Sequence, residues 1–255
     1  MTTDNAVKFN CFKYLHRMQH LILLHGAIGA KQQLEPLSNA LSPQFNIHLI
    51  NFPGHGGRAM PSSVFSIELF ASDVLGYMKE NNIEQANVFG YSMGGYAAVY
   101  LAKHHPEKIN RIITLATKFY WDEATAAKEI KMLDANTIRQ KLPAFAGKLY
   151  ERHLPNNWKA VLAETIIMLT ALGSHNTLSI DDYTSINTPC LILLGDRDKM
   201  VTLDETVAVY KQLPNAQLCV LPNTQHPLEH ADIALLSFFI KRHLIQQAAL
   251  NDNLE

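Results

Sequence analysis

The sequence lacks the features that would assign the chain to a membrane, to a nucleic acid or to a secretory route. No apolar run approaches the roughly 20 residues that a transmembrane helix needs. The 22 basic and 23 acidic residues nearly balance to a net charge of −1, and no basic block is present. This argues against a nucleic-acid or anionic-membrane partner. Residues 1–10 contain no basic segment followed by an apolar one, so no signal peptide is indicated and we expect a cytoplasmic protein.

Cysteine is also scarce, with three widely spaced residues, Cys11, Cys190 and Cys219. The number is odd and no Cys-x-x-Cys pair occurs, and Cys190 and Cys219 each lie in a strand-like run, which predicts that these two are buried free thiols. The segment His226-Pro-Leu-Glu-His230 is not a zinc motif, because its proline would break a helix that presents two ligands. Neither glycine-rich nucleotide motif occurs. We therefore expect no metal and no cofactor.

Short apolar segments alternate with helical patterns along the chain, and its 255 residues suit one large core. This alternation predicts an α/β fold, with a mostly parallel sheet flanked by helices. The predicted strands are Leu21–Leu24, Asn46–Asn51, Ala86–Gly90, Arg111–Ala116, Pro189–Leu194 and Gln217–Leu221. The predicted helices between and after them are Gln32–Leu41, Ser66–Asn82, Gly94–His104, Leu203–Leu213 and Glu229–Gln247.

The pentapeptide Gly90-Tyr91-Ser92-Met93-Gly94 follows an apolar run and leads into a small-residue helical pattern. Strand, sharp turn and helix in this order lift one serine hydroxyl clear of a sheet. The outer glycines fit this interpretation, because side chains there would collide with the neighbouring strand and helix. Ser92 is therefore the predicted nucleophile.

A serine nucleophile needs an oxyanion site and an orienting carboxylate. His25-Gly26-Ala27 leaves the end of the first predicted strand, so the backbone N–H groups of Ala27 and Met93 are predicted to hold an oxyanion. Asp196 and Asp198 follow the strand that ends at Leu194. Asp198 lies further into the loop and is the predicted acid. Asp196 would orient the turn or pair with the adjacent arginine, and a purely turn-stabilising role for both acids is the alternative.

The general base is predicted to be His226, which lies in the last loop before the C-terminal helix. A histidine there can reach Ser92 and Asp198 if the last strand ends converge. The other histidines compete poorly: His16 and His20 precede the first predicted strand, and His48, His104, His105 and His243 lie within or at the ends of predicted elements. For His55, a role in its turn is favoured over one at the border of the site.

One interval of about seventy residues, between Ala116 and Pro189, carries no strand signal. Such long loops are uncommon, so its helical periodicity predicts a helical insertion. The insertion's predicted helices are Glu123–Leu133, Asn136–Leu142 and Trp158–Leu172, the last with Gly173 as its C-cap. Most of its aromatic residues would pack it onto the main domain, and a minority would line an apolar pocket above Ser92. The pocket candidates are His25, Ile28, Tyr91, Phe119, Trp121, Phe145 and Trp158.

These motifs together resemble the α/β-hydrolase family nearly end to end, in which nucleophile, acid and histidine occur in this order along the chain. The segments that carry the resemblance are His25-Gly26, Asn51-Phe52-Pro53-Gly54-His55-Gly56, the pentapeptide at Ser92, Pro189–Asp198 and the late His226. The family often has Asp at the position of Asn51, which is structural. The resemblance implies a helical cap inserted after the sixth family strand, with 118–185 as the cap and 1–117 and 186–255 as the core. It also favours Asp198, since the family's acid usually lies three residues beyond the glycine.

A serine nucleophile, where related enzymes acting on epoxides or halides use aspartate, implies acyl transfer. The leading hypothesis is a serine hydrolase that cleaves a small to medium, fairly apolar carboxylic ester or thioester through an acyl-enzyme. One alternative is hydrolysis of a carbon–carbon bond in a dienoic keto acid, which needs a basic group for the substrate carboxylate. The candidates for that group are Lys31, Arg58, Lys118 and Arg152. The other alternative is a non-catalytic ligand receptor with this fold.

Overall fold

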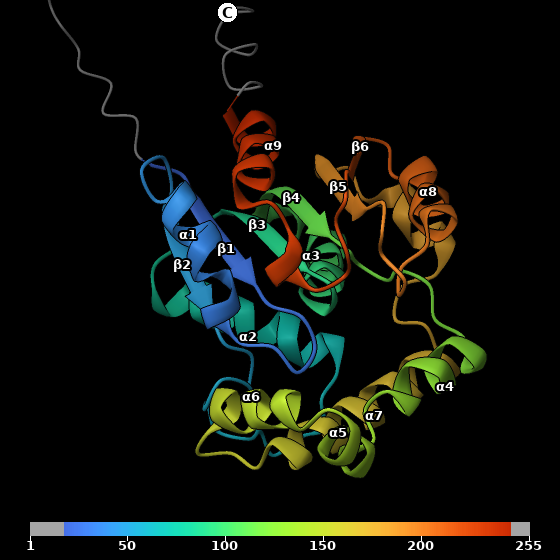
Figure 1. Ribbon diagram of the computed structural model, residues 1–255. Coiled ribbons are helices and arrows are strands. Elements are labelled where there is room, and N and C mark those ends of the chain that lie inside the picture. The colour runs from blue at the N-terminus through green and yellow to red at the C-terminus, as the bar shows by residue number, and fades with distance from the viewer. Residues whose placement is uncertain (1–17, 246–255) are drawn as a thin grey trace, which may run out of the picture.

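The computed structural model describes residues 18–245, so Cys11 and the end of the last predicted helix lie outside the described residues. Six parallel strands form one sheet in the order β2-β1-β3-β4-β5-β6 (Figure 1). The strands are β1 (His20–Leu24), β2 (Asn46–Ile50), β3 (Ala86–Tyr91), β4 (Ile109–Leu115), β5 (Cys190–Gly195) and β6 (Ala216–Leu221). All six predicted strands are thus confirmed, with their ends shifted by at most two residues.

Helices cover both faces of the sheet, which explains why its central strands are apolar throughout rather than alternating. In β1, Leu21 and Leu23 pack with the helices of one face, while Ile22 and Leu24 pack with those of the other. The first face carries α1 (Glu35–Leu41), which follows a 3₁₀ turn (Lys31–Leu34), and α9 (Ile233–Ile245). The other face carries α2 (Ile67–Glu80), α3 (Met93–His104) and α8 (Leu203–Gln212).

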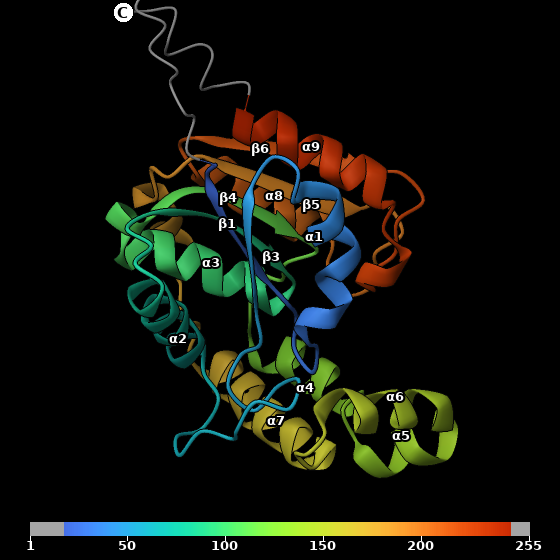
Figure 2. The same ribbon diagram turned by 90° about the vertical axis from the view of Figure 1, so that its left-hand side faces the viewer.

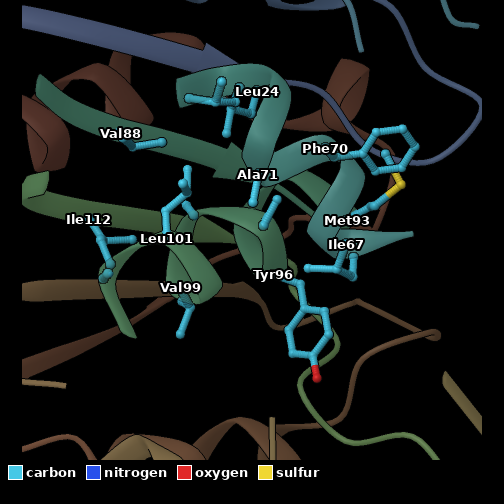
Figure 3. Close-up of a cluster of buried hydrophobic side chains, with 14 of the residues drawn as sticks. Leu24, Ile67, Phe70, Ala71, Val88, Met93, Tyr96, Val99, Leu101 and Ile112 are labelled. Carbon is cyan, nitrogen blue, oxygen red and sulfur yellow. The ribbon is translucent and has the colours of Figure 1, made fainter. Parts of the chain in front are cut away.

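The core of the second face surrounds α3, whose small residues let it lie close to the sheet (Figure 3). Phe70 of α2, Val88 of β3 and Leu101 of α3 are fully buried there. Tyr96 extends from this cluster, and its hydroxyl donates to Asn176 Oδ1 (2.5 Å) and accepts from the backbone N–H of Leu178 (3.0 Å). Helix α3 is thereby tied to the segment that returns to β5.

The predicted helical insertion lies between β4 and β5, at the end of the sheet toward which β1 and β2 point (Figures 1 and 2). It consists of α4 (Glu123–Lys131), α5 (Ala135–Lys141), α6 (Pro143–His153) and α7 (Trp158–Ser174). Asp122 and Asp134 cap α4 and α5 by accepting from backbone N–H groups, each at 2.7 Å. The insertion also has a small core of its own, formed by Ile138, Ala146, Leu149, Trp158 and Leu162.

Two details of the insertion differ from the sequence predictions. Helix α6 was not predicted, although Pro143 occupies a helix-starting position that suits its fixed φ. The prediction of Gly173 as a C-cap is wrong, because α7 continues to Ser174. A Cβ on Gly173 would lie 2.6 Å from Ala126 Cβ of α4, so the glycine permits the two helices to pack closely.

Among residues 18–245, no helix combines the length and apolar character that crossing a bilayer requires.

Candidate active site

Ser92 occupies the tight turn between β3 and α3, with φ 52° and ψ −117°. This is an unfavourable conformation for a residue with a side chain, and it persists because neighbouring groups fix the backbone. The N–H of Ser92 donates to the Leu115 carbonyl (2.9 Å), and its carbonyl accepts from Thr117 Oγ1 (3.1 Å). Leu115 is the last residue of β4 and Thr117 lies two residues beyond it, so the adjacent strand and the loop after it hold the turn.

The two glycines of the pentapeptide are required by close backbone approach. A Cβ on Gly90 would collide with the backbone of Gly94, and a Cβ on Gly94 would lie 2.6 Å from the carbonyl oxygens of Leu24 and His25. The steric role predicted for these glycines therefore agrees with the packing of α3 against β1 and β3.

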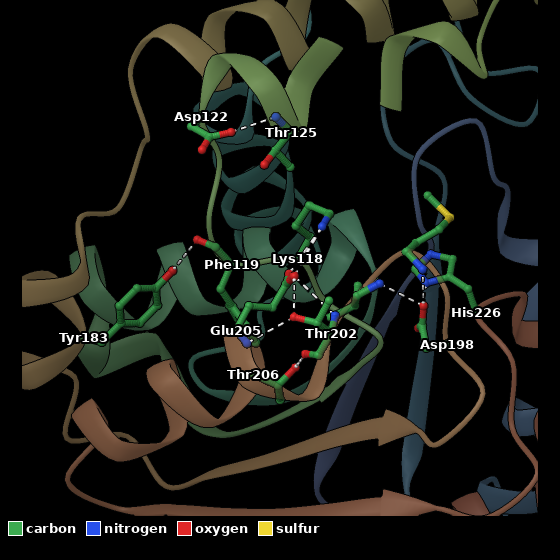
Figure 4. A network of polar contacts seen from close by, with 12 residues as sticks. Lys118, Phe119, Asp122, Thr125, Tyr183, Asp198, Thr202, Glu205, Thr206 and His226 are labelled. Atoms are coloured by element: carbon green, nitrogen blue, oxygen red, sulfur yellow. Dashed lines mark hydrogen bonds and ion pairs between the residues drawn. The ribbon is translucent and has the colours of Figure 1, made fainter. Parts of the chain in front are cut away.

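Asp198 and His226 are joined directly: His226 Nδ1 lies 2.8 Å from Asp198 Oδ2 (Figure 4). The other carboxyl oxygen of Asp198 accepts from the N–H groups of Met200 (2.8 Å) and Val201 (2.9 Å). Burial alone would raise the pKa of Asp198, but the hydrogen bond and charge of His226, together with these N–H groups, hold it below its ordinary value. The carboxylate is thus ionised and oriented toward the histidine.

Asp196 has a different environment from Asp198. Its Oδ1 accepts from the N–H of Thr224 (3.1 Å), and its Oδ2 lies 3.6 Å from Arg197 Nε. These contacts fix the loop that precedes His226, as the turn-orienting interpretation of Asp196 requires.

Ser92 and His226 line the same cavity, which has a volume of about 280 Å³. The Tyr91 hydroxyl donates to the His226 carbonyl (3.0 Å) and so ties the histidine loop to the residue before Ser92. Within residues 18–245, no hydrogen bond joins the Ser92 hydroxyl to the His226 ring. Because Asp198 engages Nδ1, Nε2 is the nitrogen available to a group in the cavity.

The cavity is mainly apolar, and the sheet and the insertion both contribute to it. Of the predicted residues, Ala27, Ile28, Tyr91, Met93, Trp121 and Phe145 line it beside Ser92 and His226. Helix α7 also contributes four residues that were not named as pocket candidates: Thr165, Met168, Leu169 and Leu172. Their spacing of three and four residues marks one helix face and could have identified them.

Three predicted pocket residues do not line the cavity, because each packs elsewhere. His25 is fully buried, with Nδ1 on the Gly26 carbonyl (2.8 Å) and Nε2 accepting from the Phe52 N–H (3.1 Å). Phe119 belongs to the sheet-side core, and Trp158 belongs to the insertion's own core. Aromatic character alone did not distinguish packing residues from lining residues.

Polar side chains interrupt the apolar lining at two places. Lys118 and Glu129 lie at one, and Gln33, Arg152 and Glu229 lie at the other. Lys118 Nζ is 3.4 Å from both oxygens of Glu205 (Figure 4). Arg152 Nη1 donates to the Ile28 carbonyl (3.0 Å). Lys31 and Arg58, the other predicted basic candidates, do not line this cavity.

Helix α6 holds the loop that follows β1. Ile28 has φ 51°, and its carbonyl accepts from Arg152 Nη1 and from His153 Nε2 (3.1 Å). His153 Nδ1 in turn accepts from the Gly56 N–H (3.3 Å), so this ring bridges two loops of the sheet domain in its neutral form.

His153 belongs to a cluster of buried histidines with His25 and His55. The His55 ring centroid lies 5.1 Å from that of His25 and 5.7 Å from that of His153. Burial lowers the pKa of His25 and of His153 to about 4, and it lowers the pKa of His55 well below the ordinary value. The cluster is therefore uncharged at neutral pH.

Comparison with known proteins gives a consistent family relationship. The sequence profile described as "alpha/beta hydrolase fold" matches residues 19–166. A pimeloyl-(acyl-carrier protein) methyl ester esterase of Vibrio campbellii is 25% identical over 238 residues, covering 81% of this chain and 87% of that protein.

Solved structures have the same architecture at low sequence identity, which is evidence for the fold alone. The enol-lactonase from Burkholderia xenovorans has a TM-score of 0.73 at 20% identity, covering 90% of this chain and 92% of that one. The 2-hydroxy-6-oxo-6-phenylhexa-2,4-dienoate hydrolase from Rhodococcus sp. has a TM-score of 0.74 at 16% identity, covering 89% and 90%.

Proposed function

Because this chain belongs to the α/β-hydrolase family, and is a hydrolase of that family, we propose that it cleaves a small to medium, fairly apolar carboxylic ester or thioester through a serine acyl-enzyme. The observation that carries the proposal is the 2.8 Å hydrogen bond from His226 to a buried carboxylate in a cavity that Ser92 also lines. An imidazole oriented in this way is the base that a serine hydroxyl needs. We also propose that residues 118–185 form a cap over this site.

In the proposed reaction, His226 Nε2 takes the proton of the Ser92 hydroxyl as its oxygen attacks the ester carbonyl. The N–H groups of Ala27 and Met93 stabilise the oxyanion, and Asp198 stabilises the imidazolium. The C–O or C–S bond then breaks, and the leaving alcohol or thiol receives the proton from His226. Water, deprotonated by His226, attacks the acyl-enzyme and releases the acid and the Ser92 hydroxyl.

The occupied basic groups favour a neutral substrate over a dienoic keto acid. Lys118 faces Glu205, and Arg152 is engaged by the Ile28 carbonyl. A substrate carboxylate would have to compete with these contacts, whereas an uncharged ester would only bury apolar surface. The related methyl ester esterase supports the same choice.

The proposal is tested with an active-site fluorophosphonate and with p-nitrophenyl butyrate. We expect the wild type to be labelled and to hydrolyse the ester. Ser92→Ala should lose the label and about 10⁴-fold or more in kcat while keeping its circular dichroism spectrum. Ser42→Ala, which removes an exposed hydroxyl on the sheet domain, should behave as wild type. A wild type that neither labels nor hydrolyses would favour the receptor alternative.

A further inference from the structure

Two polar groups in the cavity wall have no hydrogen-bond partner in the part of the chain that the structure describes. Glu129 of α4 is only 4% exposed, and neither of its carboxyl oxygens has a hydrogen-bond partner among residues 18–245. The same holds within that range for Nε1 of Trp121, which lies just before α4. Both side chains line the cavity that contains Ser92 and His226.

Unpaired buried polar groups lower the stability of a protein, and most are therefore paired. An apolar side chain at position 129 would match the neighbouring Ala126, which faces the same way and packs against α7. A carboxyl group here consequently needs an explanation other than packing.

The nearby cation does not satisfy the carboxyl group. Lys118 Nζ lies 6.0 Å from the Trp121 ring centroid, but its ion pair is with Glu205. Burial raises the pKa of Glu129, and the charge of Lys118 only partly opposes this effect. Glu129 is therefore available to bind a group that enters the cavity.

We propose, on the premise of the ester hydrolase activity above, that Glu129 and Trp121 form a polar subsite that binds a hydroxyl group on the substrate chain. A hydroxyl both donates and accepts, so it can donate to a Glu129 oxygen and accept from Trp121 Nε1–H. The preferred substrates are thus hydroxylated esters rather than plain aliphatic ones.

The charges around the subsite disfavour the other polar groups. An ammonium group would lie beside Lys118 and would leave the Trp121 donor without an acceptor. A carboxylate would meet the Glu129 carboxyl group and would leave its oxygens without a donor. A neutral hydroxyl avoids both conflicts and satisfies both unpaired groups.

The test compares kcat/KM for p-nitrophenyl hexanoate with kcat/KM for its derivatives that carry one hydroxyl group on the acyl chain. The hydroxyl lies on the terminal carbon, on the penultimate carbon or on the third carbon from the chain end. A parallel series uses hexyl acetate hydroxylated at the corresponding positions of the alcohol, which covers both sides of the ester bond. We expect the wild type to prefer at least one hydroxylated isomer by about tenfold. No preference in either series would overturn the proposal.

Variants distinguish loss of the subsite from a general change in packing. The measured quantity is the ratio of kcat/KM for a hydroxylated ester to kcat/KM for the matched plain ester. Glu129→Met keeps a similar volume but removes the acceptor, and should bring the ratio close to one. Trp121→Phe should lower it several-fold. Met168→Leu, an apolar control in the same wall, should change both esters by the same factor. A preference that persists in Glu129→Met would contradict the assignment.

A binding measurement keeps this inference separate from the proposed function. Two variants are titrated calorimetrically, Ser92→Ala and the double variant that also carries Glu129→Met. Each is titrated with methyl hexanoate and with its hydroxylated derivatives. Tighter binding of a hydroxylated ester by about tenfold, lost in the double variant, supports the subsite even if the wild type hydrolyses no ester. Equal binding of all the esters overturns the subsite even if the wild type is an active esterase.

Discussion

The sheet domain and the helical insertion meet at one cavity but contribute different kinds of side chain. The sheet domain contributes Ser92, Asp198 and His226 from loops that follow strands, on backbone fixed by close packing. The insertion contributes mainly apolar side chains on helices that have a small core of their own. We infer that the proposed catalytic groups and most of the groups that select the substrate lie on different parts of the chain.

The largest effect on activity is expected from a substitution in the sheet domain. Asp198→Asn should lower kcat/KM for p-nitrophenyl butyrate by about 10³–10⁴-fold, because the amide cannot stabilise an imidazolium or hold its tautomer. Asp196→Asn, a matched change two residues away, should cost less than about tenfold because Asp196 only fixes the loop. Steady-state kinetics at pH 7.5 measures both. The opposite ranking would move the role of the acid to Asp196.

A smaller effect is expected from the insertion, and of a different kind. Phe145→Ala and Met168→Ala enlarge the cavity and should shift the preference among p-nitrophenyl esters by about tenfold toward longer acyl chains. The second-order rate of labelling by a small fluorophosphonate should stay within about twofold of wild type. A large fall in the labelling rate with unchanged chain-length preference would break the proposed separation.

The smallest effect at neutral pH concerns the histidine cluster, to which both regions contribute. The pKa values of His25, His55 and His153 are lowered in the folded state. Their contribution to the stability of the folded state is therefore complete at pH values above the ordinary histidine pKa of about 6.5. As the pH falls from 6.5 toward 4, the unfolded chain binds protons that the folded chain does not. The free energy of unfolding should therefore fall, by on the order of a few kcal/mol.

Urea denaturation between pH 7.5 and 4.5 measures this loss. His153→Gln, which can accept and donate without titrating, should flatten the pH dependence. If His153→Gln and wild type lose stability in parallel, the part of the cluster that α6 contributes is not the source of the acid sensitivity.

The sequence predicts the sheet domain better than it predicts the contacts of the helical insertion. Strands could be located because their apolar runs are short and bounded by turn residues, as at Leu191–Leu194. The tight turn at Ser92 could be located because both glycines are needed there. The pairing of Asp198 with His226 depends on two loops far apart in sequence, and the sequence indicated it through the order of the motifs. The catalytic roles of these residues stay predictions until the variants are measured.

The insertion was harder to interpret because its contacts depend on how its helices dock. Trp158 and Phe119 were expected at the pocket, yet each lies in a core. Glu129 stands between Lys128 and Lys131, which suggests a solvated helix face. The apolar residues around it, Ala126 and Ile130 of α4 and Leu133 just after the helix, mark this side as turned inward.

The backbone of Ile28 limits how freely the insertion could be exchanged for that of another protein with this fold. Its carbonyl is held by Arg152 and His153, and the next residue toward the N-terminus is the proposed oxyanion donor Ala27. A chimera that replaced the insertion with another would discard both side chains and leave the loop free to relax from its positive φ. Grafting specificity onto this enzyme would therefore require transplanting these two side chains with the helices, or the exchange would disable the chemistry that it was meant to redirect.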